Sequence, residues 1–335
     1  MILMGKKSAA GTVAIVMLTI LAASFWVFVL YSDWNRETGS YTIPIADHNV
    51  SKVEVITRSS AMGIEIGVLP TTSANIFQGD WEHVYSQFGQ SDMIPENISF
   101  TNETVGDTLR ITINAVSNGA LNHMGISIWN MTLYLNANYI NNLTVRNDAG
   151  SVEINLSKIT LSQLNVATDA GSCEITLSNV ILDNGLKVST NAGSCDLTLV
   201  NVTLSNNASV MTDAGSLKLV MHNLVLTTNI GLDVQTNAGS NEIIWNQENT
   251  LGAKMDIRAN TDAGSLDLTI RGSLTYLRYD ITQTANVGSK SFVGGTQFTG
   301  SEGTYQSTNI ADTTKDLITI NAATDVGSNT ITISA

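Results

Sequence analysis

Charged residues, proline and cysteine are all scarce in this chain of 335 residues. Charged side chains make up 13 per cent of it, and the net charge is −13, with the few Lys and Arg residues scattered along the sequence. The sequence has no cluster of Lys and Arg residues that could contact the phosphates of a nucleic acid, so we predict no nucleic-acid partner. The three prolines, Pro44, Pro70 and Pro95, all lie in the first third of the chain, which leaves the remainder free to form unbroken β-ladders.

Histidine and cysteine are too few for most catalytic and metal sites. A catalytic serine needs a positioned base, and the histidines, at positions 48, 83, 123 and 222, lie outside the repeated serines described below. Two cysteines without a neighbouring histidine do not make a zinc site. We therefore predict no catalytic residues and no organic cofactor, and we expect that the chain is not an enzyme.

A four-residue phrase, Asp or Asn followed by Ala-Gly-Ser, returns six times between residues 148 and 265, with consecutive glycines 21 to 25 residues apart. Such self-similarity indicates a repeat architecture in which one repeat forms one structural coil. Glycine is expected where the backbone needs a positive φ. The side chain of an Asx residue before it can hydrogen-bond to the backbone of the same turn. The phrase is therefore predicted to be a corner. The predicted turn glycines are Gly150, Gly171, Gly193, Gly215, Gly239, Gly264, Gly288 and Gly327, the last two following Val in place of Ala.

Apolar and polar residues alternate on both sides of each corner. Around Gly171, for example, Leu164 and Val166 precede the corner and Ile175 and Leu177 follow it, and a period of two predicts strands. Two strands in about 22 residues cannot bury an apolar face alone, so the coils must stack with parallel strands about 4.8 Å apart. We predict an all-β parallel β-helix or β-solenoid of about nine coils, and the chirality of parallel crossovers favours a right-handed wind.

The predicted organisation places the repeats in residues 108–335, with an insertion near 292–314. Residues 52–107 are expected to hold a first coil and a cap-like insertion. Within that insertion, the segment from Asp80 to Phe88 is predicted to form a short capped helix. Residues 33–51 are expected to be a linker.

An uncharged, apolar run covers residues 11–32 and is long enough to cross a bilayer as one transmembrane helix. A cleaved signal peptide is the alternative, but the run is longer than a usual h-region and no Ala-x-Ala site follows it. Lys6 and Lys7 precede the run, so the positive-inside rule keeps residues 1–10 in the cytoplasm. We predict a single-pass cell-membrane protein, anchored through residues 11–31, with an extracellular solenoid.

Stacking turns equivalent repeat positions into columns, and two of these columns are acidic. One holds the Asx residues of the corners, and the other is a run of carboxylates interrupted by Lys218. Oxygen ligands from such columns could hold Ca²⁺ between coils. The alternative is that Asx is simply a residue that turns prefer, and that the outer carboxylates form a solvated face. The candidate calcium residues are Asp148, Glu153, Asp169, Glu174, Asp196, Asp213, Glu242, Asp262 and Asp267.

Cys173 and Cys195 occupy the same place in adjacent repeats and share the parity of the inward residues. Stacked Cα atoms about 4.8 Å apart would permit a disulfide, and two small apolar core residues are the alternative. The repeated serines and threonines form hydroxyl ladders, which we interpret as structural because no base lies beside them.

The phrases TDAGSCEITL, TNAGSCDLTL, TDAGSLKLVM and TDAGSLDLTI resemble the putative-adhesin family, a domain of unknown function built from β-strand repeats. The resemblance covers roughly residues 142–333. It implies an anchored cell-surface or envelope protein, and it brings no catalytic residues with it.

We therefore expect a non-enzymatic, membrane-anchored protein whose ectodomain serves adhesion or envelope structure, with a glycan or protein surface as partner. One alternative is a polymer-forming scaffold similar to bactofilins, which self-associates through its coil ends. It is favoured by a chain that stops in a strand at residues 331–335 and would leave the last coil uncovered. A β-helical polysaccharide-active enzyme is the other alternative, and it needs a cluster of Asp, Arg and Lys that does not follow the repeat.

Overall fold

The computed structural model describes residues 33–47, 49–60, 62–87, 98–115 and 127–334. These residues form 24 β-strands that are hydrogen-bonded into one continuous sheet. Helical structure in the described ranges is limited to two 3₁₀ turns, η1 (Ile45–Asp47) and η2 (Gly295–Gln297). The predicted all-β class is confirmed.

Coils in the middle of the molecule have three sides. β11 (Cys173–Ser178) leads over a corner to the short β12 (Ile181–Leu182), and a bend then leads to β13 (Leu186–Ala192). Equivalent strands of the next coil, β14 (Cys195–Val200), β15 (Thr203–Leu204) and β16 (Ala208–Ala214), pair with them in parallel and in register. The predicted parallel pairing between successive repeats is therefore confirmed, and we call this array the coil stack.

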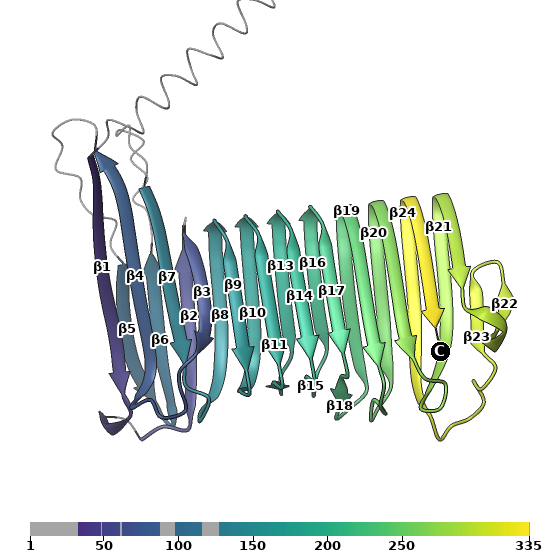
Figure 1. The fold of residues 1–335 in the computed structure, drawn as a ribbon, viewed down its shortest axis with the longest axis horizontal. Helices are drawn as coiled ribbons and strands as arrows, with labels where there is room; N and C mark the ends of the chain where they lie inside the picture. The colour runs from purple at the N-terminus through teal and green to yellow at the C-terminus, as the bar shows by residue number, and fades with distance from the viewer. Residues whose placement is uncertain (1–32, 48, 61, 88–97, 116–126, 335) are drawn as a thin grey trace, which may run out of the picture.

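The remaining strands extend the coil stack in both directions (Figure 1). Towards one end lie β1 (Asp33–Pro44), β2 (Lys52–Ser59), β3 (Gly63–Val68), β4 (Asn75–Gln87), β5 (Ile98–Val105), β6 (Thr108–Ala115), β7 (Ser127–Leu135), β8 (Ile140–Ala149), β9 (Val152–Ser157) and β10 (Thr160–Ala170). Towards the other end lie β17 (Leu217–His222), β18 (Val225–Leu226), β19 (Ile230–Gln247), β20 (Met255–Gly272), β21 (Leu277–Val293), β22 (Phe298–Ser301), β23 (Thr304–Ser307) and β24 (Asp316–Ser334).

Glycine is required at the repeated corner. All eight predicted turn glycines have positive φ values, between 106° and 148°. A Cβ atom placed on Gly215 would lie 2.0 Å from the carbonyl oxygen of Gly193, and one placed on Gly264 would lie 1.6 Å from that of Gly239. Neither the backbone conformation nor the spacing of the coils leaves room for a side chain.

A second corner, not predicted from the sequence, creates the third side of the coil. Lys158, Asn179, Asn201 and Asn223 have φ values between 51° and 56°. Asn tolerates this left-handed region better than most non-glycine residues. The side-chain amide of Asn201 also donates a hydrogen bond to Oδ1 of Asn179, 3.3 Å away, which ties adjacent coils together.

Chain order and spatial order differ at both ends of the coil stack. The last strand in the chain, β24, lies between β20 and β21 and pairs in parallel with both (Figure 1). The coil formed by β2 and β3 likewise lies between β6–β7 and β8–β9. The expectation that residues 331–335 leave the last coil uncovered is wrong for the described residues 331–334, because β24 has a partner on each side.

Antiparallel strands close the end that contains β1. β4 pairs with β1 on one side and β7 on the other, and β5 pairs with β6. The helix predicted from Asp80 to Phe88 is wrong, since residues 80–87 belong to β4 and hydrogen-bond to two neighbouring strands. Residues 33–51, expected to be a linker, contain β1. The Tyr41 and Phe100 rings stack with centroids 4.9 Å apart and cover this end of the core.

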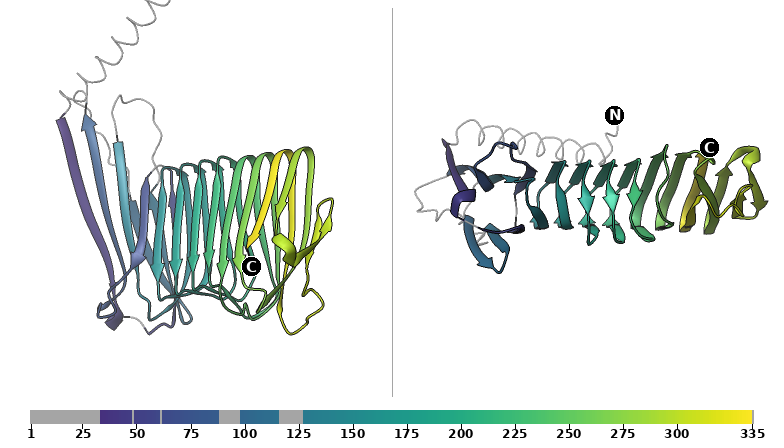
Figure 2. Two further views of the ribbon diagram at one scale, coloured as in Figure 1. Left: turned by 45° about the vertical axis from the view of Figure 1, so that its right-hand side comes forward. Right: turned by 90° about the horizontal axis from the view of Figure 1, so that it is seen from below.

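The insertion near 292–314 contains the β22–β23 hairpin, which closes the opposite end (Figure 2). β23 pairs antiparallel with β21, the last strand of the coil stack. Phe292 stacks on Tyr305 with ring centroids 3.9 Å apart, and Phe298 contacts both Phe292 and Tyr279. The insertion therefore covers the core with an aromatic cluster.

Inward residues of every coil form one continuous apolar core. Cys173 and Cys195 face each other across adjacent strands inside it, and both are buried free thiols. One row of the core is polar: the Thr190 hydroxyl donates to the Thr212 hydroxyl at 2.9 Å, both almost fully buried. The threonine ladder read from the sequence is thus an internal, structural row.

The predicted transmembrane helix at 11–32 lies outside the described residues, as does the cytoplasmic segment 1–10. Within the described ranges, no helix has the length and apolarity needed to cross a membrane.

Candidate functional site

In both predicted acidic columns, equivalent residues of successive coils lie next to one another. Glu153, Glu174 and Asp196 lie opposite one another on successive strands, all exposed, and Lys218 follows in the next coil. The ammonium group of Lys218 forms an ion pair with Glu242, its neighbour on the other side, at 2.9 Å. This contact raises the pKa of Lys218 through hydrogen bonding and charge attraction.

The Asx residues at the corners bond to one another along the stack. Amides of Asn191 and Asn237 donate to the carboxylates of Asp169 and Asp213, at 2.9 and 3.0 Å. In the part of the chain that the structure describes, no three His, Cys, Asp or Glu side chains converge as metal ligands. The calcium site stays a prediction without a preformed cluster behind it.

The described histidines have structural surroundings. His83 is buried and stacks on Trp129 with ring centroids 3.8 Å apart. His222 lies beside the Asn246 amide, with its Nδ1 atom 3.1 Å from Nδ2. The corner serines bond along their own ladder, as Ser265 does to Ser240 at 3.1 Å. None of these contacts joins a serine to a base, so they support no nucleophilic catalysis.

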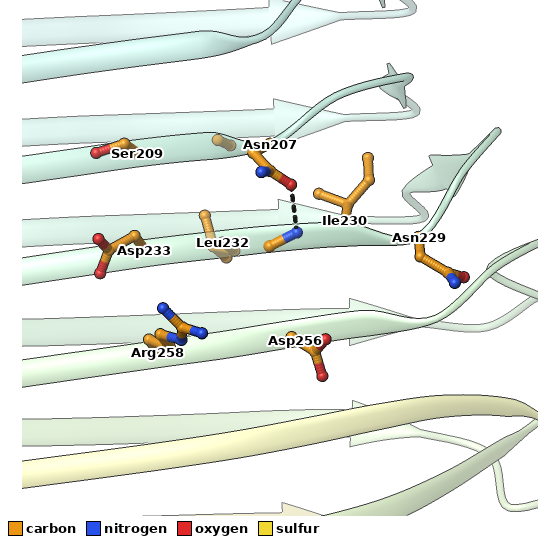
Figure 3. A pocket seen from close by; sticks show the side chains of 10 residues that line it. Asn207, Ser209, Asn229, Ile230, Leu232, Asp233, Asp256 and Arg258 are labelled. Atoms are coloured by element: carbon orange, nitrogen blue, oxygen red, sulfur yellow. Dashed lines mark hydrogen bonds between the residues drawn. The ribbon is translucent and has the colours of Figure 1, made fainter.

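A hollow of about 510 Å³ opens on the lateral face formed by β16, β19 and β20 (Figure 3). We call it the Arg258 hollow. Its polar rim does not follow the repeat phrase, unlike the acidic columns. It is lined by Asn207, Ala208, Ser209, Asn229, Ile230, Gly231, Leu232, Asp233, Asp256 and Arg258.

A missing side chain creates the Arg258 hollow. Gly231 lies in β19 opposite Asp256 of β20, at an outward position where neighbouring coils carry Asn207 and Asp256. Its φ is not in the left-handed region, so local backbone geometry does not require glycine here. The side chain of Asn207 leans over the gap, and its Oδ1 accepts a hydrogen bond from the Gly231 N–H at 2.7 Å (Figure 3).

Hydrogen bonds within the rim orient its charged groups. Both carboxylate oxygens of Asp233 accept from the Gln235 amide at 3.0 Å, and Asp256 forms an ion pair with Lys254 at 2.8 Å. Arg258 lies directly opposite Asp233 in the ladder, exposed to solvent. Two carboxylates and one guanidinium group therefore lie around the same hollow, with the donor Arg258 beside the acceptor Asp233.

A smaller hollow of about 270 Å³ lies on the same side of the molecule near β2 and β6. Its charges already neutralise one another: Arg110 contacts Glu54 at 2.6 Å and Glu103 at 3.1 Å. These bonds raise the pKa of Arg110, so its guanidinium is committed to protein partners. The Arg258 hollow is the better candidate for a ligand.

Sequence analysis did not identify the Arg258 hollow. Strand register, which brings Arg258 opposite Asp233, cannot be read from the sequence without the stack. One signal was available: Gly231 interrupts an alternating strand away from any corner phrase, and an isolated strand glycine marks a bulge or a close approach.

Comparison with known proteins identifies one family. Residues 65–184, a little over a third of the chain, match the family described as the N-terminal domain of toast_rack, DUF2154. No curated protein matches the chain.

Several solved structures have a remote likeness to it. A "putative cell adhesion protein" from Clostridium sporogenes is 13% identical over 90% of this chain and 100% of its own, with a TM-score of 0.31. A "putative adhesin" from Bacteroides fragilis is 11% identical over 90% and 97%, with a TM-score of 0.40. A "Putative lipid binding protein" from Parabacteroides distasonis is 11% identical over the same shares, with a TM-score of 0.21. Likeness this remote carries no information about what this chain binds.

Proposed function

We propose that this chain is a non-enzymatic, membrane-anchored cell-surface protein whose extracellular coil stack, a β-solenoid, serves adhesion. The observation that supports this most is the combination of two covered ends with a long, regular lateral surface. Such a stack is rigid because every coil buries its apolar side against two neighbours. Contact with a partner then falls to the lateral faces and to loops.

The start of the coil stack supports the proposed surface display. β1 starts at Asp33, directly after the apolar run at residues 11–31. An anchor in that run would leave no long linker between the bilayer and the β1 end. The hairpin end lies at the far end of the coil stack from β1 (Figure 1).

The hairpin end argues against the polymer-forming alternative. Lys290 of β21 occupies an inward position, opposite Asn329 of β24 and in the same row as Leu266. A further coil stacked on β21 would bury the ammonium group of Lys290, which is costly. Natural β-proteins use inward-pointing charges of this kind to prevent pairing at a sheet edge. The Lys290 ammonium instead donates to the carbonyl of Glu302 in the hairpin at 3.2 Å. We infer that the coil stack ends here and does not polymerise.

The enzyme alternative has little geometric support. The Arg258 hollow brings Asp and Arg side chains together, but its carboxylates are bonded to Gln235 and Lys254. A general acid or base needs a perturbed environment and a free proton-transfer path. Both carboxylates are already engaged by these neighbours, and binding is the role that suits them.

Adhesion is tested by retention of cells on glycoprotein-coated surfaces. Cells producing the full chain are compared, under flow on mucin-coated glass, with cells producing residues 1–51 alone. We expect several-fold more retained cells for the full chain. Equal retention at matched surface amounts would contradict the proposed function.

A further inference from the structure

We propose that the Arg258 hollow binds a short neutral saccharide, one or two sugar units, through pairs of adjacent hydroxyl groups. This inference rests on the proposed adhesive function and gives it a site and a ligand class. It is carried by the shape of the hollow, the order of donors and acceptors around it, and its charge.

Shape is the first argument. The hollow has a volume of about 510 Å³, within the range of pockets that hold small ligands. Its floor is the backbone at Gly231, flanked by Ile230 and Leu232, whose side chains turn into the core. A sugar ring can lie in the space beside the Asn207 side chain because no side chain projects from Gly231.

Hydrogen bonds and an ion pair hold Asn207, Asp233 and Asp256 before any ligand arrives. Because Oδ1 of Asn207 is held by the Gly231 N–H, the Asn207 amide presents its NH₂ group to the hollow. Asp233 is oriented by Gln235 and Asp256 by Lys254, and both carboxylates keep further lone pairs. Arg258 adds a fork of N–H donors on the same rim (Figure 3).

This alternation suits adjacent hydroxyl groups. A hydroxyl donates one hydrogen bond and accepts others, so it can donate to Asp233 while it accepts from Arg258. A second hydroxyl on the neighbouring carbon can do the same between Asp256 and Asn207. Leaving any of these groups unpaired on binding would cost affinity, so ligands without paired hydroxyls should be rejected.

Charge decides between neutral and acidic sugars. The rim carries two carboxylates, Asp233 and Asp256, and one guanidinium, Arg258. Lys254 beside Asp256 brings the sum of these four charges to zero, so the hollow has no excess positive charge to attract an anion. The whole chain has a net charge of −13, which repels an anion. Neutral saccharides are therefore favoured over sialylated or uronic ones.

The described lining of the hollow contains no aromatic side chain, so binding by a single site should be weak, with a Kd on the order of millimolar. An anchored protein compensates for this by presenting many copies on one surface. Multivalent contact then raises avidity without any new interaction.

The test is saturation-transfer NMR on the full chain, kept in a detergent without a sugar headgroup. The probes are lactose, maltose and chitobiose as neutral disaccharides, and sialyllactose as the acidic one. We expect transfer to at least one neutral disaccharide and at least five-fold weaker binding of sialyllactose. Absence of transfer to all three neutral probes, or preference for sialyllactose, would overturn the proposal.

Two variants locate the binding to the hollow. Gly231→Thr fills it without changing charge, and the space above Gly231 admits a Cβ, which would lie 3.4 Å from Oδ1 of Asn207. Arg258→Ala removes the donor fork. Each variant should weaken binding at least five-fold with little change in Tm. The matched control is Asn165→Thr, an outward position on the same face outside the hollow, which should bind as the wild type does.

Failure of this inference differs from failure of the proposed function. If Gly231→Thr binds the disaccharide like the wild type, the saccharide site lies elsewhere and the inference is wrong. In the flow assay, Gly231→Thr cells that adhere like wild-type cells would overturn the inference alone. Wild-type cells that do not adhere would overturn the proposed function.

Discussion

The side-chain amide of Asn191 donates a hydrogen bond to the carboxylate of Asp169, one coil earlier in the stack, at 2.9 Å. Asn237 and Asn286 make the same bond to Asp213 and Asp325. Alternation of Asp and Asn at the corners is therefore a bonding pattern: Asn191 and Asn237 each separate two carboxylates and bond one of them. Two pairs of corner carboxylates are adjacent: Asp148 and Asp169 on β8 and β10, and Asp262 and Asp325 on β20 and β24, the latter because β24 inserts there.

This pattern predicts opposite effects for two substitutions in one column. Asn191→Asp should place four carboxylates in consecutive coils, from Asp148 to Asp213, and lower the Tm by about 1–3 °C at pH 7. Asp325→Asn should raise the Tm by a similar amount, because the new amide can bond Asp262. Calorimetry measures both. The two shifts should shrink in 1 M NaCl, which screens exposed charges, and shifts of the same sign would contradict the pairing account.

Corner geometry predicts a large difference between neighbouring residues. Gly215→Val forces a β-branched side chain into a φ of 146° and against the Gly193 carbonyl, so it should cost at least about 3 kcal/mol. Ser216→Ala, at an exposed position, should change stability by less than about 0.5 kcal/mol. Urea unfolding of both variants measures the order, and a reversed order would refute the corner.

The buried thiols predict a pH dependence at the alkaline end. A hydrogen bond with Cys195, together with burial, raises the pKa of the Cys173 thiol far above its usual range. A group whose pKa is raised by folding contributes stability below its unfolded pKa, about 8.5 for a thiol, and loses it as the pH rises. The Tm of the wild type should therefore fall more steeply above pH 8.5 than that of Cys173→Val/Cys195→Val.

Valine suits both positions because Val152 precedes them in the same row of the core. The same burial predicts that thiol reagents modify neither cysteine in the native protein and both in denaturant. Parallel Tm curves for wild type and double variant, or rapid native labelling, would show that the thiols are not buried together.

The hairpin end predicts a monomer that can be converted into an assembling protein. Lys290→Leu combined with replacement of residues 295–306 by Gly-Gly removes both the inward charge and the cover of β21. Light scattering should then show concentration-dependent oligomers, since an uncovered edge strand pairs with other chains. Lys290→Leu alone, with the hairpin in place, should stay monomeric. Filaments formed by the unmodified chain would contradict the account of this end.

Local features of the structure were predictable because they repeat. The corner glycines follow from a phrase that only a positive φ explains, and the inward position of Ile175 follows from strict alternation. The second corner at Asn179, Asn201 and Asn223 also repeats every 22 residues, but it lacks glycine and was overlooked. A search for Asn at that period would have found it.

Long-range features were not predictable, because they depend on which strands pair. The alternation in β24 suits any place in the stack, so nothing local assigns it to the slot between β20 and β21. The segment from Asp80 has no strict apolar alternation, and it becomes a strand through its partners β1 and β7. The Arg258 hollow depends on the same pairing, since Asp233 and Arg258 meet only across adjacent coils.

Surface display is tested most directly by a cysteine placed at the far end of the coil stack. Because the native thiols are buried, Ser301→Cys in the exposed hairpin would be the accessible thiol among the described residues. In intact cells, a membrane-impermeant maleimide should label Ser301→Cys, whereas Ser8→Cys, in the N-terminal segment, should be labelled only after permeabilisation. Labelling of Ser8→Cys but not Ser301→Cys in intact cells, or release of the labelled chain into the medium, would contradict an anchored protein with its coil stack outside the cell.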